Sequence, residues 1–191
     1  MALLFEDVVF GPVNSRRFGR SLGINLLPLS NKVCNFNCVY CECGWTDLKS
    51  IKFSYFPFEI ICAKIQQAFK ELSLKAEVPD CITFAGNGEP TMHPQFGEIM
   101  DRVIEYRNQY LSGCKIVVLS NAALAGNQKV FDALQKADLR VLKLDAGSDA
   151  MFQKIDKPLS GKSLNWHISK LKAFKGRLII QSMFLKGKHN G

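Results

Sequence analysis

Four cysteines, Cys34, Cys38, Cys41 and Cys43, lie within one short stretch and constrain the fold more than any other feature of the chain. Asparagines and a glycine surround them, and these residue types favour turns over helices and strands. Thiolates gathered in one loop can converge on one metal centre, and soft sulfur ligands select zinc, copper(I) or iron–sulfur clusters. The sequence therefore predicts a metal centre held by an irregular loop.

The first three cysteines follow the spacing C-x3-C-x2-C, and Tyr40 directly precedes the third. Three thiolates on a four-iron cluster leave one iron open to a small chelating molecule. This spacing resembles the cluster motif of the radical S-adenosylmethionine (radical SAM) superfamily. The resemblance implies that Cys34, Cys38 and Cys41 hold a [4Fe–4S] cluster. It also implies that the open iron binds the amino and carboxyl groups of S-adenosylmethionine (SAM), and that Tyr40 packs near the adenine.

A zinc site is the alternative interpretation of the same cysteines. Zinc modules usually combine one CxxC knuckle with a second, distant pair of cysteines or histidines. This chain has no second knuckle, because His93, His167 and His189 are isolated from one another and from pairs of cysteines. Cys43 stays outside the predicted ligand set, since three ligands already satisfy the motif.

Beyond the cysteines, apolar runs alternate with amphipathic patterns of helical period. The runs predict strands at 22–27, 32–33, 81–85, 115–119, 139–144 and 177–183, and the helical patterns cover 57–72, 94–106 and 127–135. Ser148 and Ser163 are predicted N-caps of two further helices. Near the N-terminus, residues 5–10 alternate weakly and Gly11–Pro12 predicts a turn.

Strands that alternate with helices are typical of parallel βα units. We expect an α/β fold, a parallel (β/α) partial TIM-like barrel with about five βα units, as a single domain over residues 1–191. Cores of the superfamily usually have six units, so the resemblance implies that the chain is truncated before the sixth and leaves a sheet edge exposed. In such a barrel the site lies at the carboxyl ends of the strands.

Glycine and polar residues follow the predicted strand at 81–85 in the segment Gly86-Asn87-Gly88-Glu89-Pro90. Glycines there allow a ligand to approach the backbone closely. The segment resembles the GGEP motif of radical SAM enzymes, which binds the methionine amino group, and Asn87 stands where the first glycine usually is. The resemblance assigns this role to Gly88 and Glu89, and a turn with a solvated glutamate is the alternative.

Ser120 and Asn121 follow the next predicted strand, and Asp145 follows the one after it. The resemblance implies that Ser120 and Asn121 reach the ribose or carboxylate of SAM and that Asp145 binds a ribose hydroxyl or the substrate. Each of these residues alone is also an ordinary turn former. The segments 10–24 and 88–94, which include His93, further resemble uncharacterised oxidoreductases related to the wyosine tRNA-modifying enzymes. For His93, a packing role at a helix entry is the simpler interpretation.

Composition says less about partners. The net charge of +8 suits an anionic partner such as RNA, although many soluble proteins are equally basic. The densest basic group lies near the C-terminus and comprises Lys170, Lys172, Lys175, Arg177, Lys186 and Lys188. Arg16, Arg17 and Arg20 in a glycine-rich loop either contact a carboxylate or phosphate of a cofactor or belong to a solvated loop.

The N-terminus lacks the basic region of a signal peptide, and no apolar run approaches the roughly 20 residues of a membrane span. We expect a cytoplasmic protein whose seven cysteines are reduced and which does not associate with a membrane.

The resemblance implies a radical SAM enzyme of the oxidoreductase or transferase type. Its reduced cluster would cleave SAM to methionine and a 5′-deoxyadenosyl radical, which abstracts hydrogen from an unknown substrate. An electron donor such as flavodoxin or ferredoxin is the implied partner. Two alternatives remain open: a non-catalytic iron–sulfur or zinc module that binds nucleic acid, and a truncated, inactive homologue.

Overall fold

The computed structural model describes residues 2–47, 54–176 and 178–184. Its centre is one sheet whose six strands follow the order of the chain. The strands are β1 (Val9–Ser15), β2 (Gly19–Ile24), β3 (Cys81–Phe84), β4 (Lys115–Ser120), β5 (Leu139–Lys143) and β6 (Leu178–Gln181). β1 is antiparallel to β2, and every later pair is parallel. The α/β class with a mostly parallel sheet, as in a partial TIM-like barrel, is therefore confirmed.

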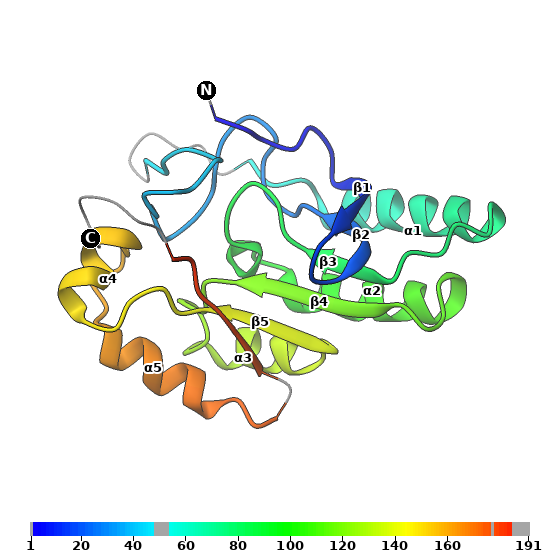
Figure 1. The fold of residues 1–191 in the computed structure, drawn as a ribbon. Helices are drawn as coiled ribbons and strands as arrows, with labels where there is room; N and C mark the ends of the chain where they lie inside the picture. The colour runs from blue at the N-terminus through cyan, green and yellow to red at the C-terminus, as the bar shows by residue number, and fades with distance from the viewer. Residues whose placement is uncertain (1, 48–53, 177, 185–191) are drawn as a thin grey trace.

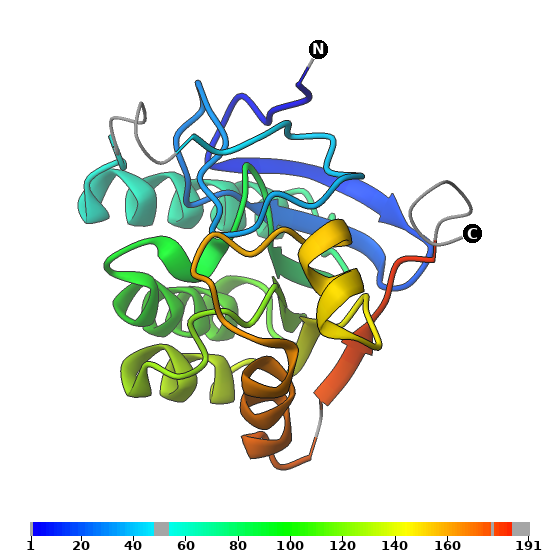
Figure 2. The ribbon, with the colours of Figure 1, turned by 90° about the vertical axis from the view of Figure 1, so that its left-hand side faces the viewer.

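Helices connect the parallel strands. They are α1 (Phe58–Leu74), the 3-10 helix η1 (Pro90–Met92), α2 (Phe96–Tyr110), α3 (Gln128–Gln135), α4 (Asp149–Ile155) and α5 (Leu164–Ala173). Figure 2 shows α1, α2 and α3 side by side along one face of the curved sheet. In Figure 1 the arrowheads of β4 and β5 point toward the side where the cysteine loop and α4 lie. The carboxyl ends of the strands thus form the edge over which this loop is placed.

The main core lies between the sheet and the first three long helices. Ile65 and Phe69 of α1 and Ile99 of α2 pack there against Ile82 and Ile116 of the strands, and all five side chains are fully buried. Successive side chains of a strand point to opposite faces, so the alternate residues Cys81, Val117 and Val141 form a smaller cluster of their own. Both faces of the central strands are therefore apolar, as the continuous hydrophobic runs predicted.

Two predicted helix N-caps are confirmed. The Ser148 hydroxyl accepts a hydrogen bond from Met151 N at 3.3 Å, and the Ser163 hydroxyl accepts one from Trp166 N at 3.2 Å. Each bond satisfies a backbone donor that the first turn of a helix leaves without an intrahelical acceptor.

The prediction of a turn at Gly11–Pro12 is wrong, because β1 runs through both residues. The pairing of β1 with β2 shifts register between Phe10 and Val13, so the pair sits in an irregular part of the strand. Proline lacks a backbone donor and is tolerated at such a bulge on an edge strand. The predicted piece at 32–33 is not a strand either, since Val33 forms only an isolated bridge with Gly88.

β6 forms the other edge of the sheet. Within residues 2–47, 54–176 and 178–184, β5 is the only strand paired with it. Ile179 and Ile180 of β6 are exposed. Arg177, where the last predicted strand begins, lies outside the described residues, as do Lys186, Lys188 and His189. Among the described residues, no helix combines the length and apolar character that crossing a membrane requires.

Replacing Ser163 with alanine should lower the free energy of unfolding by about 1 kcal/mol, because the first turn of α5 loses its cap. Urea denaturation monitored by circular dichroism measures this change. Ser73→Ala is the matched control, since Ser73 lies exposed within α1 and makes no cap there. A Ser163→Ala protein as stable as the Ser73→Ala protein would contradict a role of this cap in stability.

Candidate functional site

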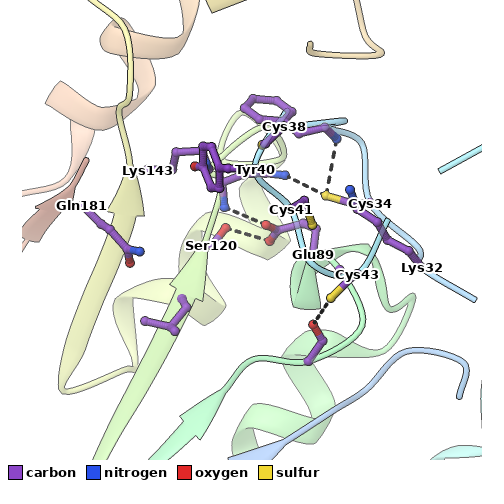
Figure 3. Close-up of a pocket in the computed structure, with 15 residues that line it drawn as sticks. Lys32, Cys34, Cys38, Tyr40, Cys41, Cys43, Glu89, Ser120, Lys143 and Gln181 are labelled. Carbon is purple, nitrogen blue, oxygen red and sulfur yellow. Dashed lines mark hydrogen bonds between the residues drawn. The ribbon is translucent and has the colours of Figure 1, made fainter. Parts of the chain in front are cut away.

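A cavity of about 220 Å³ opens at the carboxyl ends of the strands, directly under the cysteine loop. Its polar and sulfur-bearing lining residues are Lys32, Cys34, Cys38, Tyr40, Cys41, Cys43, Glu89, Ser120, Asn121, Lys143 and Gln181. Figure 3 shows these groups gathered from the loop and from the ends of successive strands. The structure thus brings together every residue predicted for the site except Asp145. Their roles toward a cofactor stay predictions.

Short-range hydrogen bonds hold the cysteine loop in its irregular path. The Asn37 side chain and the Thr46 backbone exchange two hydrogen bonds, at 3.0 and 2.7 Å. The Thr46 hydroxyl in turn accepts from Cys34 N at 3.2 Å. Asn37 and Thr46 are both buried, so these bonds replace the ladder that regular secondary structure would provide. These hydrogen bonds therefore connect the two ends of the loop without a contribution from a metal.

The thiols of Cys34, Cys38, Cys41 and Cys43 all face the same cavity. Among the described residues, no three His, Cys, Asp or Glu side chains come together in an arrangement for a single metal ion. The four thiols instead surround a shared space, and sulfur-only ligands are the donors that iron–sulfur clusters use. The donor set and the shared cavity thus fit a polynuclear cluster.

Burial makes two of these thiols hard to ionise. It raises the pKa of Cys34 to about 12 and that of Cys38 to about 11. The pKa of Cys41 is lowered, first by its interaction with the Cys43 thiol and also by the nearby Lys32 ammonium. The same contact with Cys41 raises the pKa of Cys43. A metal that binds Cys34 and Cys38 must therefore displace two protons.

Glu89 is buried at the end of β3 and its carboxylate accepts four hydrogen bonds. Oε1 accepts from Thr91 N, Thr91 Oγ1 and Ser120 Oγ, at 3.2, 2.6 and 2.7 Å. Oε2 accepts from Asn121 N at 2.6 Å. Burial raises the pKa of Glu89, while these donors act against that increase. The carboxylate thereby joins the loop after β3 to the end of β4.

Gly88 is required by the close approach of the cysteine loop to the loop after β3. Val33 N donates to Asn87 O at 2.9 Å, and Glu89 N donates to Val33 O at 3.0 Å. Gly88 lies between these bonds with φ +137°, and a Cβ there would stand 1.9 Å from Val33 O. Only glycine permits both this conformation and this contact.

Asn87, which departs from the usual glycine of the motif, has a structural role here. Its side chain donates to Phe5 O and Pro28 O at 2.9 and 3.0 Å and accepts from Phe5 N at 2.7 Å. It is fully buried and does not line the cavity. The asparagine therefore ties the N-terminal segment to the site without occupying the space of a cofactor.

Asn121 links the end of β4 to the cysteine loop. Its Nδ2 donates to Asn35 Oδ1 at 2.7 Å and lies 3.5 Å from Cys34 Sγ. Ser120 donates to Glu89, so both polar residues predicted at the end of β4, Ser120 and Asn121, contact other residues of the site. The wall formed by β3, β4 and the cysteine loop is thus one hydrogen-bonded unit.

Asp145 follows the end of β5 as predicted, but it lies behind the lining of the cavity. Its side chain is only 1% exposed, and it does not line the cavity. Oδ2 accepts from Tyr40 Oη and from Lys143 Nζ, and Oδ1 accepts from Met183 N at 2.8 Å. Lys143 also donates to Tyr40 Oη. In the structure Asp145 holds Tyr40 and Lys143 in place, and its role toward a ribose hydroxyl or the substrate stays a prediction.

Sequence reasoning missed three residues beside the cysteines. Lys143 reaches the cavity from the end of β5 and forms ion pairs with Asp145 at 2.5 Å and Asp156 at 3.4 Å. Asp156 is fully buried and lies 3.7 Å from the Cys38 thiol. Lys32 is buried two positions before the first cysteine. The signal for Lys143 was a charged residue in an apolar strand, whereas Lys32 and Asp156 gave no local signal.

The three arginines of the glycine-rich loop lie far from this site. Arg16, Arg17 and Arg20 are exposed in and beside the β1–β2 hairpin, and Arg20 N donates to Asp80, which precedes β3. They are thus at the amino ends of the strands, and the solvated loop is the correct interpretation. His93 packs its ring against Tyr55 with centroids 5.1 Å apart and does not line the cavity, which favours a packing role.

Residues 30–187 match the Radical SAM superfamily. Among curated proteins, two UPF0026 proteins of Helicobacter pylori strains are each 36% identical, over 94% and 98% of this chain and 57% and 59% of their own lengths. A UPF0026 protein of Synechocystis is 34% identical over 93% of this chain and 64% of its own length. The chain thus spans about three fifths of the length of these relatives.

Solved structures share the fold at low sequence identity. Archaeal TYW1 superposes with a TM-score of 0.52 at 19% identity, covering 90% of this chain and 57% of that one. A radical SAM methyltransferase from Sphaerobacter thermophilus superposes with a TM-score of 0.56 at 14% identity, covering 84% and 46%. Together with the match over residues 30–187, the sheet and the cysteine loop establish that this chain belongs to the radical SAM superfamily.

Proposed function

We propose that the chain binds a [4Fe–4S] cluster through Cys34, Cys38 and Cys41 and binds SAM at the iron that has no protein ligand. The observation that carries this proposal is the gathering of these thiols with Glu89 and Asn121 around one cavity at the strand ends. When bound, the cluster would supply one electron for cleavage of SAM to methionine and a 5′-deoxyadenosyl radical, which takes hydrogen from the substrate.

The chain's own residues would bind and orient SAM. Gly88 exposes backbone next to the cavity, and the Glu89 carboxylate lies beside it, where the methionine ammonium would bind. Ser120 and Asn121 would face the ribose or the carboxylate. Tyr40, held by Asp145 and Lys143, would offer its ring to the adenine. Because hydrogen bonds fix these groups in advance, little reorganisation is needed when SAM binds.

The proposed enzyme also requires an electron donor and a substrate. A small redox protein such as flavodoxin or ferredoxin would reduce the cluster. The seven free cysteines are compatible with a reducing compartment such as the cytoplasm. For the substrate, the positive net charge of +8 supports RNA as one class.

Exchanging single cysteines for serine tests which of them hold the cluster. Cys41→Ser should abolish the electron paramagnetic resonance (EPR) signal of a reduced [4Fe–4S] cluster after anaerobic reconstitution with iron and sulfide. Cys43→Ser is the matched control and should keep the signal and its change on addition of SAM. If both variants lose the EPR signal equally and the wild-type protein contains stoichiometric zinc, the result would favour a zinc module.

Replacing Glu89 with glutamine tests the SAM site. We expect at least tenfold weaker SAM binding, about 1.4 kcal/mol, because the amide cannot pair with the ammonium as a carboxylate does. The new NH2 group also faces donors, so the free energy of unfolding should fall by about 1–3 kcal/mol. Glu98→Gln, an exposed exchange on α2, is the control. An unchanged dissociation constant for SAM in a folded Glu89→Gln protein would remove Glu89 from the SAM site.

RNA binding can be tested by its salt dependence. Fluorescence anisotropy with a labelled transfer RNA should show affinity that falls at least tenfold between about 50 and 200 mM salt, since phosphate contacts release counterions. Binding that does not respond to salt, or no binding at either concentration, would direct the search to peptide or small-molecule substrates.

A further inference from the structure

Lys32 is a buried cation in the wall of the cysteine cavity. It is only 3% exposed, and its Nζ donates to the backbone oxygen of Gly44 at 2.9 Å. No ion pair joins Lys32 to an Asp or Glu side chain within the part of the chain that the structure describes. Removing an ammonium group from water without a counter-charge is costly, and buried lysines are normally paired.

The second lysine of the cavity has the opposite surroundings. Lys143 is paired with two carboxylates, those of Asp145 and Asp156. Its charge is therefore compensated within the protein, whereas the hydrogen bond described for the Lys32 ammonium goes to the neutral backbone oxygen of Gly44. The two residues allow a comparison between a partly buried lysine in ion pairs and a buried lysine that has no ion pair among the described residues.

The groups around Lys32 are those predicted to hold the cluster. Lys32 lines the cavity together with Cys34, Cys38 and Cys41. Burial raises the pKa of Cys34 and Cys38, and the Lys32 ammonium works against that increase at both. Lys32 is thus close enough to interact electrostatically with these thiols. Three thiolates outweigh the positive charge of an oxidised [4Fe–4S] core, so the bound group is anionic, and reduction makes it more so.

We propose that Lys32 is the counter-charge of the cluster, a positioning residue that stabilises the bound anionic group and makes it easier to reduce. This inference rests on the proposed function. Lys32 does not ligate iron; its ammonium, held by Gly44 O, acts on the cluster through its fixed charge. Lys32, which has no carboxylate partner among the described residues, gains an anionic partner when the cluster binds.

The experiment compares Lys32→Met with Lys143→Met in the complete chain, first without metal. Methionine fills similar space without charge, so Lys32→Met should be at least as stable as the wild type in urea denaturation. Lys143→Met should be less stable, because it leaves two carboxylates buried without a cation. If Lys32→Met is destabilised as much as Lys143→Met, Lys32 serves as a structural support of the loop, and the proposal is wrong.

The second readout is the reduction midpoint of the reconstituted cluster, followed by EPR. Lys32→Met should lower the ratio of reduced to oxidised cluster about tenfold at a fixed potential, a negative shift of about 59 mV for one electron. Lys32→Arg, which keeps the charge, should restore the midpoint. An unchanged midpoint in Lys32→Met would overturn the proposal.

Two further outcomes separate this inference from the proposed function. If Lys32→Met does not retain a cluster but Lys32→Arg does, the positive charge is required, as proposed. If neither variant retains a cluster, the shape of the lysine side chain matters instead of its charge, and the proposal is wrong. If the wild type itself forms no cluster, the proposed function and this inference both fail. A wild type that forms the cluster and responds to SAM keeps the proposed function whatever the Lys32 variants show.

Discussion

The backbone contact between Val33 and Gly88 is the constraint on which the rest of the site depends. It is an isolated bridge between the cysteine loop and the loop after β3, and it leaves no room for a side chain at Gly88. Through it, an irregular segment without helix or strand is fixed to the rigid edge of a parallel sheet. The neighbouring Glu89 then faces β4, and Asn121 faces Cys34. One close approach of two backbones thus places the thiols and the carboxylate around the same space.

Much of this arrangement follows from local sequence patterns. Continuous apolar runs such as 115–119 predicted central parallel strands, because both faces of such strands are covered. The caps at Ser148 and Ser163 were predicted from single residues, since a hydroxyl before a helical pattern satisfies a free backbone donor. Cys34, Cys38, Cys41 and Glu89 were assigned to one site by the resemblance of their motifs to those of the radical SAM superfamily. These features depend on short stretches of chain.

The features that the sequence did not predict arise from contacts between distant segments. The Asp145 carboxylate bonds to Tyr40, 105 residues away, and no local pattern indicates that contact. A strand-end aspartate looks the same in sequence whether it faces a cavity or holds another side chain. Gly11–Pro12 reads as a turn by residue type, and only the pairing of β1 with β2 turns it into an irregular strand. Arg16, Arg17 and Arg20 were ambiguous because no local pattern tells which end of the strands a hairpin occupies.

Charge divides the cavity into two unlike halves. On the β3–β4 side, Glu89, Ser120 and Asn121 bond to one another and to the cysteine loop, so this wall is ordered independently of any ligand. On the β5 side, Lys143 is neutralised by Asp145 and Asp156, and Tyr40 is joined to the same group. Among the described residues, Lys32 forms no ion pair with a carboxylate, and Glu89 forms none with a cation. A site built in this way favours an anionic group next to Lys32 and a cationic group next to Glu89, because binding would give each of these buried charges a partner of opposite sign.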